Sequence, residues 1–178
     1  MNRTKSLLVW LVIIAIGAFV AEFVRKQQPS RGSAPSPQTG EAISGRARVV
    51  DGDSLVIGNQ RIRLFGIDTP EGRQECRDAA GRAYGCGNEA RRALESLIGS
   101  RPVACAPTGQ SYDRKVALCR VSGNDLGEGL VRAGHALELR NHSRGRYSAA
   151  EREARDARRG LWAGSFERPS EWRRAHPR

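Results

Sequence analysis

The sequence predicts an α+β domain built on a small, closed or partly closed β-barrel of five strands with three α-helices. Three observations lead to this prediction. Short β-rich segments separated by turn residues fill the first half of the domain. Residues that can cap a helix precede the helical segments of the second half, and glycine stands at or just beyond the expected helix ends. An apolar N-terminal segment and a linker precede the domain.

The five expected strands are short. They span residues 46–50, 54–57, 60–67, 102–106 and 115–121. In the third strand Ile62 and Leu64 alternate with Arg61 and Arg63. Because successive side chains of a strand point to opposite faces, the apolar pair should face the core and the arginines the other side.

The three expected helices each start from a capping residue. We expect them over residues 88–98, 125–133 and 148–160, with Asn88, Asp125 and Ser148 as caps. Ser148 followed by Glu151 has the spacing of a capping box. Leu161 and Trp162 should fold back onto the core, and the basic tail over residues 164–178 should be loosely held.

The N-terminal segment from Leu7 to Val24 is apolar except for Glu22. As a helix it would reach about 27 Å, just enough to cross the hydrocarbon core of a membrane. We therefore expect residues 1–26 to form a single transmembrane signal anchor, with a cleaved signal peptide as the alternative. Residues 27–44 are rich in Pro and Ser and should be a flexible linker to a domain over residues 45–163.

Cysteine content and charge bear on compartment and partner. The four cysteines include no C-x-x-C pair, which gives a zinc site little support. Two disulfides in an oxidising compartment are favoured over four unpaired buried thiols, which places the domain outside the cytoplasm, periplasmic or extracellular, and secreted if the N-terminal segment is cleaved. The net charge of +11 favours a polyanionic partner, either nucleic acid or a membrane surface.

Carboxylates are concentrated in two turn-like segments, residues 51–54 and 68–71. Asp53, Asp68 and Glu71 stand at expected strand ends, where side chains can face a cleft. Oxygen ligands without nearby cysteine or histidine suit calcium or magnesium. Taken alone, Asp51 and Gly52 would indicate only a β-turn, and residues 69–71 only the start of a helix.

Two arginines complete the constellation. Arg63 on an expected strand and Arg114 at the start of a later one could together neutralise charge on a phosphate as it reacts. A single strand arginine usually faces solvent, as we expect for Arg61. With Asp53, Asp68 and Glu71 the pair supplies a metal site, a base and two phosphate-binding cations, which are the parts that phosphodiester hydrolysis needs.

These segments resemble the staphylococcal nuclease (thermonuclease-like) family over about residues 45–163. The resemblance rests on residues 51–54, 63–71, 112–114, 130–134 and 153–162. It implies an OB-fold, five-stranded barrel with three helices. It also implies that Asp53, Asp68 and the carbonyl of Thr69 ligate Ca²⁺, and that Glu71 is the general base that acts on water.

The resemblance further implies the substrate contacts. Arg63 and Arg114 would bind the scissile phosphate and stabilise its transition state, and Tyr112 would help to hold a nucleotide phosphate. The family cleaves DNA and RNA and leaves 3′-phosphate ends. This chain departs from the prototype at Ser111, where the prototype has lysine. It departs again at residues 140–142, where the nucleotide-stacking tyrosines have no match.

Two cysteines in the stretch from Arg73 to Gly87 also have no counterpart in the prototype. We predict that a Cys76–Cys86 disulfide pins this stretch beside Glu71. We predict a second disulfide, Cys105–Cys119, across neighbouring strands.

Three functions therefore compete. The favoured one is a monomeric, membrane-tethered, calcium-dependent endonuclease acting on DNA and RNA. The alternatives are a non-catalytic, membrane-tethered nucleic-acid-binding OB module, and a scaffold with an inactive nuclease fold. A pure binding module needs the arginines but not the acidic set of Asp53, Asp68 and Glu71, which favours the nuclease.

Overall fold

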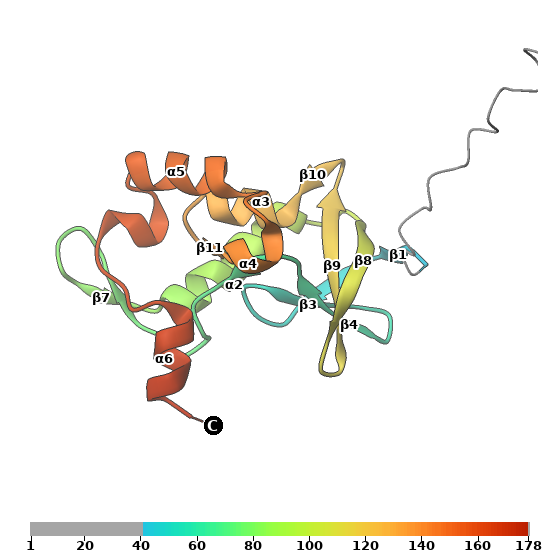
Figure 1. The fold of residues 1–178 in the computed structure, drawn as a ribbon, viewed down its shortest axis with the longest axis horizontal. Coiled ribbons are helices and arrows are strands. Elements are labelled where there is room, and N and C mark those ends of the chain that lie inside the picture. The colour runs from blue at the N-terminus through green and yellow to red at the C-terminus, as the bar shows by residue number, and fades with distance from the viewer. Residues whose placement is uncertain (1–40, 178) are drawn as a thin grey trace, which may run out of the picture. The chain divides into compact units, whose positions relative to one another are not determined.

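A mixed β-sheet forms the centre of the computed structural model, which describes residues 41–177 (Figure 1). Its seven strands are β1 (Ile43–Gly45), β2 (Ala47–Val49), β3 (Ser54–Ile57), β4 (Gln60–Leu64), β8 (Val103–Ser111), β9 (Arg114–Val121) and β10 (Asn124–Asp125). The spatial order is β1-β8-β9-β4-β3-β2, with β10 paired to β9. Neighbouring strands are antiparallel except β4 and β9, which run parallel.

The predicted barrel of five strands, closed or partly closed, differs from the observed sheet in two respects. The sheet has seven strands, and its hydrogen-bond ladder does not close among residues 41–177. The strands at the two ends of the order, β1 and β2, are three residues each and are separated only by Arg46. β1 pairs with β8 and β2 pairs with β3, so one short segment, residues 43–49, supplies both end strands of the order. The α+β class is confirmed.

The expected strands are otherwise found close to their predicted positions. β3 has the predicted bounds, and Ile62 and Leu64 of β4 are buried while Arg61 is exposed, so the predicted alternation is confirmed. The expected third strand ends early because Gly66 adopts a positive φ of 72°. After this turn the chain forms β5 (Ile67–Asp68), which pairs with β11 (Leu137–Glu138) and leaves the main sheet.

Six helical segments lie among the described residues. They are α2 (Cys86–Ile98), α3 (Leu126–Arg132), α4 (Arg140–Ser143), α5 (Ser148–Asp156), the 3₁₀ helix η1 (Gly160–Ala163) and α6 (Pro169–Ala175). Outside the main sheet, β6 (Cys76–Arg77) and β7 (Ala83–Tyr84) pair antiparallel and form a small hairpin. The three expected helices correspond to α2, α3 and α5.

The predicted caps were right for one helix only. Asp125 accepts a hydrogen bond from the backbone N–H of Glu128 and so caps α3. α2 begins two residues before Asn88, and its N-cap residue Gly85 makes no side-chain cap bond.

The predicted capping box of α5 is absent. Ser148 is the first residue of α5, and its hydroxyl donates to the carboxylate of Glu138. Glu151 accepts instead from the backbone N–H of Glu138. Both polar side chains thus bind β11 in place of their own helix. α5 ends at Asp156, before Gly160, because Arg158 has a positive φ of 50°.

The main hydrophobic core lies between the sheet and helices α2, α3 and α5. Its largest wholly buried members include Leu55, Ile62, Leu94, Val103 and Leu130. Burying each such side chain stabilises the folded state by about 1.5–3 kcal/mol relative to leaving it exposed to water. A smaller cluster gathers Cys76, Cys86, Leu137 and Leu161. Leu161 therefore folds back onto a core, as predicted.

Both predicted disulfides are present. Cys105 and Cys119 face each other across β8 and β9, and their sulfur atoms are bonded. Cys76 and Cys86 connect β6 to the first residue of α2. All four cysteines are thus paired, and the alternative of buried free thiols does not hold. The pair Cys76–Cys86 fastens the segment between Glu71 and α2.

The two ends of the domain differ from expectation. β1 starts at Ile43, inside the segment predicted as linker. The expected membrane anchor and the rest of the linker lie outside the described residues, and no helix over residues 41–177 is long and apolar enough to span a membrane. The expectation of a loosely held tail is wrong, because Ser165 pairs with Arg77 through backbone hydrogen bonds and Pro169 begins helix α6.

Candidate active site

The predicted acidic and basic residues come together where β3, β4 and β5 meet. Asp53 directly precedes β3, Arg63 lies opposite Ser54 in β4, and Asp68 ends β5. The Nη2 atom of Arg63 lies 2.7 Å from Oδ2 of Asp53 and 3.3 Å from Oδ1 of Asp68. One guanidinium nitrogen therefore lies between the two carboxylates that were predicted as metal ligands.

Asp53 is held in a buried position by its local sequence. A Cβ atom on the preceding Gly52 would lie 2.8 Å from both the Thr69 hydroxyl and the Ala90 side chain, so only glycine lets the turn pack this closely. The Oδ1 atom of Asp53 accepts from the Ser54 hydroxyl at 3.0 Å. Burial raises the pKa of Asp53 to about 7, although the Arg63 guanidinium acts to lower it.

Asp68 and Thr69 are buried on the other side of Arg63. The pairing of Asp68 with Leu137 in β11 fixes the backbone that carries both residues. The turn that follows places Glu71 at the edge of the site. There the backbone N–H of Glu71 donates to Oε1 of Gln74, while the carbonyl of Glu71 accepts from the Gln74 N–H.

Arg114 reaches the site through Ser54. Its Nη1 atom lies 3.3 Å from the Ser54 hydroxyl, which in turn donates to Asp53. Arg61 instead pairs with Asp113 on the exposed side of the sheet, as its expected surface role requires. The structure thus distinguishes the two predicted phosphate-binding arginines from a strand arginine that faces solvent.

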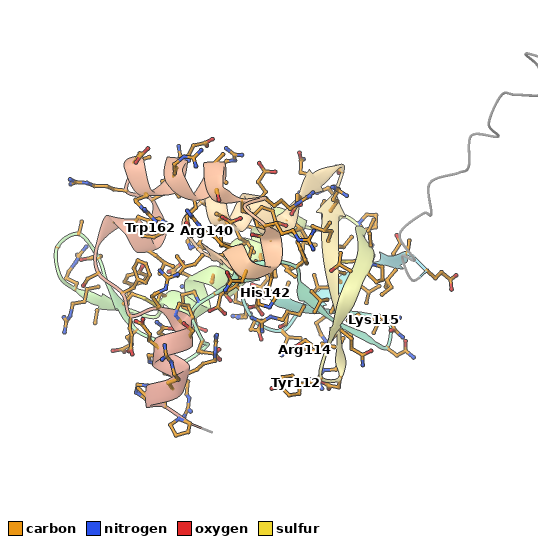
Figure 2. All side chains as sticks on the ribbon, viewed as in Figure 1. Tyr112, Arg114, Lys115, Arg140, His142 and Trp162 are labelled. Atoms are coloured by element: carbon orange, nitrogen blue, oxygen red, sulfur yellow. A yellow bond between two sulfur atoms is a disulfide. The ribbon has the colours of Figure 1, made fainter. Side chains whose placement is uncertain are left out.

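Tyr112 does not join this cluster. It occupies the turn between β8 and β9 with a positive φ of 55°, and 89% of it is exposed. Figure 2 shows its ring at the tip of the hairpin, beyond Arg114. Any contact with a nucleotide would have to be made at this outer edge.

One site residue was missed by the sequence analysis. Arg173 of α6 contacts Asp68 and Glu71 with its guanidinium group. The many basic residues of the C-terminal tail indicate a contact with acidic groups, but the sequence does not say which acidic residues are contacted or which arginine contacts them. Because the tail was expected to be loosely held and separate from the domain, this contact was not predicted.

A pocket of roughly 330 Å³ adjoins the cluster. It lies between the β8–β9 hairpin and helix α4, and Arg63, Phe65, Ser111 and His142 are among its lining residues. His142 belongs to residues 140–142, where the prototype's nucleotide-stacking tyrosines have no match, and it lines this pocket. The pocket has the size of a small-ligand site.

The donor chemistry of the site fits a hard cation. Within residues 41–177, no three or more His, Cys, Asp and Glu side chains are arranged to hold a metal ion. Asp53 and Asp68 nevertheless enclose a positive centre, the Arg63 nitrogen, between them. Two carboxylates supplemented by carbonyl and water oxygens are a ligand set typical of Ca²⁺.

Comparison with known proteins gives the family of the chain. The model of the family described as staphylococcal nuclease homologue matches residues 61–164. The chain therefore belongs to the staphylococcal nuclease homologue family, which includes phosphodiesterases.

Individual relatives match stretches of similar length. The succinoglycan biosynthesis protein ExoI of Rhizobium meliloti (strain 1021) is 36% identical over 125 residues, which are 68% of this chain and 65% of that protein. The probable staphylococcal-like nuclease CAN4 of Oryza sativa subsp. japonica is 35% identical over 69% of this chain and 23% of its own length. The probable endonuclease LCL3 of Schizophyllum commune (strain H4-8 / FGSC 9210) is 30% identical over 65% of this chain and 45% of its own length.

The matched part of this chain thus spans less than two thirds of each of these relatives.

Proposed function

We propose that this protein is a calcium-dependent endonuclease that hydrolyses phosphodiester bonds of DNA and RNA and leaves 3′-phosphate ends. The observation that carries the proposal is the position of Arg63 between Asp53 and Asp68, with Glu71 linked to Asp68 through Arg173. We assign to these neighbouring side chains the roles of a cation-binding pair, a carboxylate base and a phosphate-binding arginine. Family membership supports both the nucleic-acid substrate and the use of calcium.

In this proposal each residue has one task. Asp53, Asp68 and the Thr69 carbonyl hold the Ca²⁺ ion, which when bound supplies Lewis-acid stabilisation of charge on the phosphoryl oxygens. Glu71 takes a proton from the attacking water. The new bond forms between the water oxygen and phosphorus, the bond from phosphorus to the 5′ oxygen breaks, and the 5′ oxygen takes up a proton from solvent and leaves as a hydroxyl.

Arg63 and Arg114 hold the phosphate during this step. Negative charge builds on the phosphoryl oxygens in the transition state, and guanidinium groups facing those oxygens stabilise it more than they stabilise the ground state. Arg114 is already placed near Asp53 by its contact with Ser54. Tyr112 would touch a neighbouring nucleotide phosphate from the hairpin tip.

The two disulfides suggest a location outside the cytoplasm, because such bonds persist in oxidising compartments. We propose that the N-terminal apolar segment anchors a monomeric domain there, in the periplasm or at the cell exterior. If the segment is cleaved, the protein is secreted.

A non-catalytic, membrane-tethered nucleic-acid-binding module is the alternative. It is kept because ExoI is named for succinoglycan biosynthesis and not for a nuclease activity. The two functions differ in what they require of Glu71. A binding module has no use for a general base, whereas hydrolysis depends on it.

Cleavage of single-stranded DNA by the full chain tests the proposal. With calcium we expect cutting that a chelator stops, and we expect Glu71→Gln to lower the rate by about two to four orders of magnitude while DNA binding is kept. Equal cutting in chelator would remove calcium from the mechanism. Binding without cutting by the unmodified chain in calcium would favour the alternative.

A further inference from the structure

The guanidinium of Arg173 occupies both carboxylate oxygens of Asp68. Its Nη1 atom lies 3.0 Å from Oδ1, and its Nη2 atom lies 3.1 Å from Oδ2. The same Nη1 atom lies 3.0 Å from Oε1 of Glu71. A two-pronged, charge-assisted contact of this kind is stronger than a hydrogen bond between neutral groups and fixes the geometry of the pair. Residues 105 positions apart in the sequence thus meet at the site proposed for calcium and for the base.

The contact is built into the fold of the C-terminal segment. The buried side chain of Gln74 donates from Nε2 to the carbonyl of Glu167 at 2.7 Å, just before α6 begins. Its other end, Oε1, accepts from the backbone N–H of Glu71. One glutamine side chain therefore joins the turn that carries Glu71 to the segment that carries Arg173. α6, which ends near the C-terminus in Figure 1, is directed to the site by this bridge.

A calcium ion and Arg173 need the same atoms. Calcium takes carboxylate oxygens at about 2.3–2.6 Å, and a positive guanidinium held on Asp68 repels it as well as covering those oxygens. The side chain of Arg173 is 40% exposed, so it can leave for water without crossing the core. The two cations should therefore exclude each other.

We propose that Arg173 is an internal competitor for the calcium site, so that α6 covers Asp68 and Glu71 until calcium displaces the guanidinium. The proposal rests on the proposed function, because it takes Asp68 as a calcium ligand. Its consequence is that the apparent affinity for calcium is set by the C-terminal helix as well as by the ligands. Displacement of the guanidinium by calcium would uncover the oxygens of Asp68 and remove the contact of Arg173 with Glu71 in the same step.

Calcium binding to the full chain, measured by isothermal titration calorimetry, tests this competition directly. In Arg173→Met, which keeps the length of the side chain but removes its charge, we expect the Kd for calcium to fall by about tenfold. Arg174→Met is the matched control. Arg174 is the next residue of α6, and its Nε atom donates to the Ser170 carbonyl of the same helix. The Kd of the Arg174→Met variant for calcium should equal that of the unmodified chain.

The possible outcomes separate the two proposals. A Kd that is the same or higher in Arg173→Met than in the unmodified chain overturns the competition but leaves calcium binding intact. The same holds if Arg174→Met lowers the Kd as much as Arg173→Met does, because general charge would then explain the effect. Absence of calcium binding in all three proteins would overturn both the competition and the proposed function. Asp68→Asn in the Arg173→Met background should abolish binding if Asp68 is the shared ligand.

Discussion

Gly87, in the first turn of α2, lies directly against the backbone carbonyl of Glu71. A Cβ atom at position 87 would be 1.8 Å from that oxygen, so no other residue fits without moving the turn that carries Glu71. The neighbouring Cys86 is bonded to Cys76, which ties the chain that follows the Glu71 turn to the same helix. The position of the proposed base therefore depends on α2.

Gly87→Ala should displace Glu71 and lower the rate of DNA cleavage by at least tenfold. Overpacking of this kind costs about 1–3 kcal/mol of stability, which thermal unfolding would show. Gly72→Ala is the control, because a Cβ on Gly72, next to Glu71, meets nothing within 4 Å. If both substitutions leave cleavage unchanged, the turn tolerates movement and the exact packing of α2 does not matter for function.

Arg114→Ala should slow cleavage of bound DNA by on the order of a hundredfold, since it removes the cation that we propose stabilises charge built up in the transition state. Single-turnover kinetics with saturating enzyme measure this step without the contribution of binding. Arg61→Ala provides the comparison, because Arg61 pairs with Asp113 on the exposed face. Equal rates for the two variants would make Arg114 a surface charge.

The two disulfides should have different roles. Replacing Cys105 and Cys119 by alanine removes a link between two core strands and should cost about 3 kcal/mol in the free energy of unfolding, with the native state still active. Replacing Cys76 and Cys86 should also reduce cleavage, because it loosens the turn at Glu71. Denaturant unfolding and cleavage rates together separate the effects. Equal residual activity of the two variants would contradict this division.

Much of the site was predictable because its residues lie in short, contiguous segments. Asp53, Arg63 and Asp68 stand at strand ends or within a strand, and the strands were recognisable from turn residues and alternation. Pairing of neighbouring strands then brings such residues together. Short sequence patterns of the same kind predicted the cap at Asp125 and the disulfide between Cys105 and Cys119.

Features that depend on distant contacts were not predictable. Ser148 and Glu151 have the spacing of a capping box, but the buried backbone and carboxylate of Glu138 bind them more favourably. The hydrogen bond from Gln74 to Glu167, which directs α6 to the site, joins residues 93 positions apart, and no local pattern encodes it. Local propensity therefore located the elements, while tertiary hydrogen bonds decided the caps and the course of the tail.

Glu138 gives a prediction for stability against pH. Burial acts to raise the pKa of its carboxylate, but hydrogen bonds from the hydroxyls of Ser143 and Ser148 and from the Tyr147 N–H outweigh burial, so the pKa is lowered. A pKa that is lower in the folded state means that the unfolded chain binds the proton more tightly. The stabilisation is therefore present above the pKa of the unfolded chain, about 4.3 for glutamate, and is lost as the pH falls through the folded value.

Glu138→Ala should lower the free energy of unfolding at neutral pH by about 3 kcal/mol, because it leaves several buried donors without an acceptor. Denaturant unfolding between pH 7 and pH 3 should then show a smaller difference between variant and unmodified chain at the acid end. Glu167→Ala is a suitable control, since that side chain is on the exposed segment before α6. A difference that stays constant over the whole range would show that Glu138 acts through packing and not through its charge.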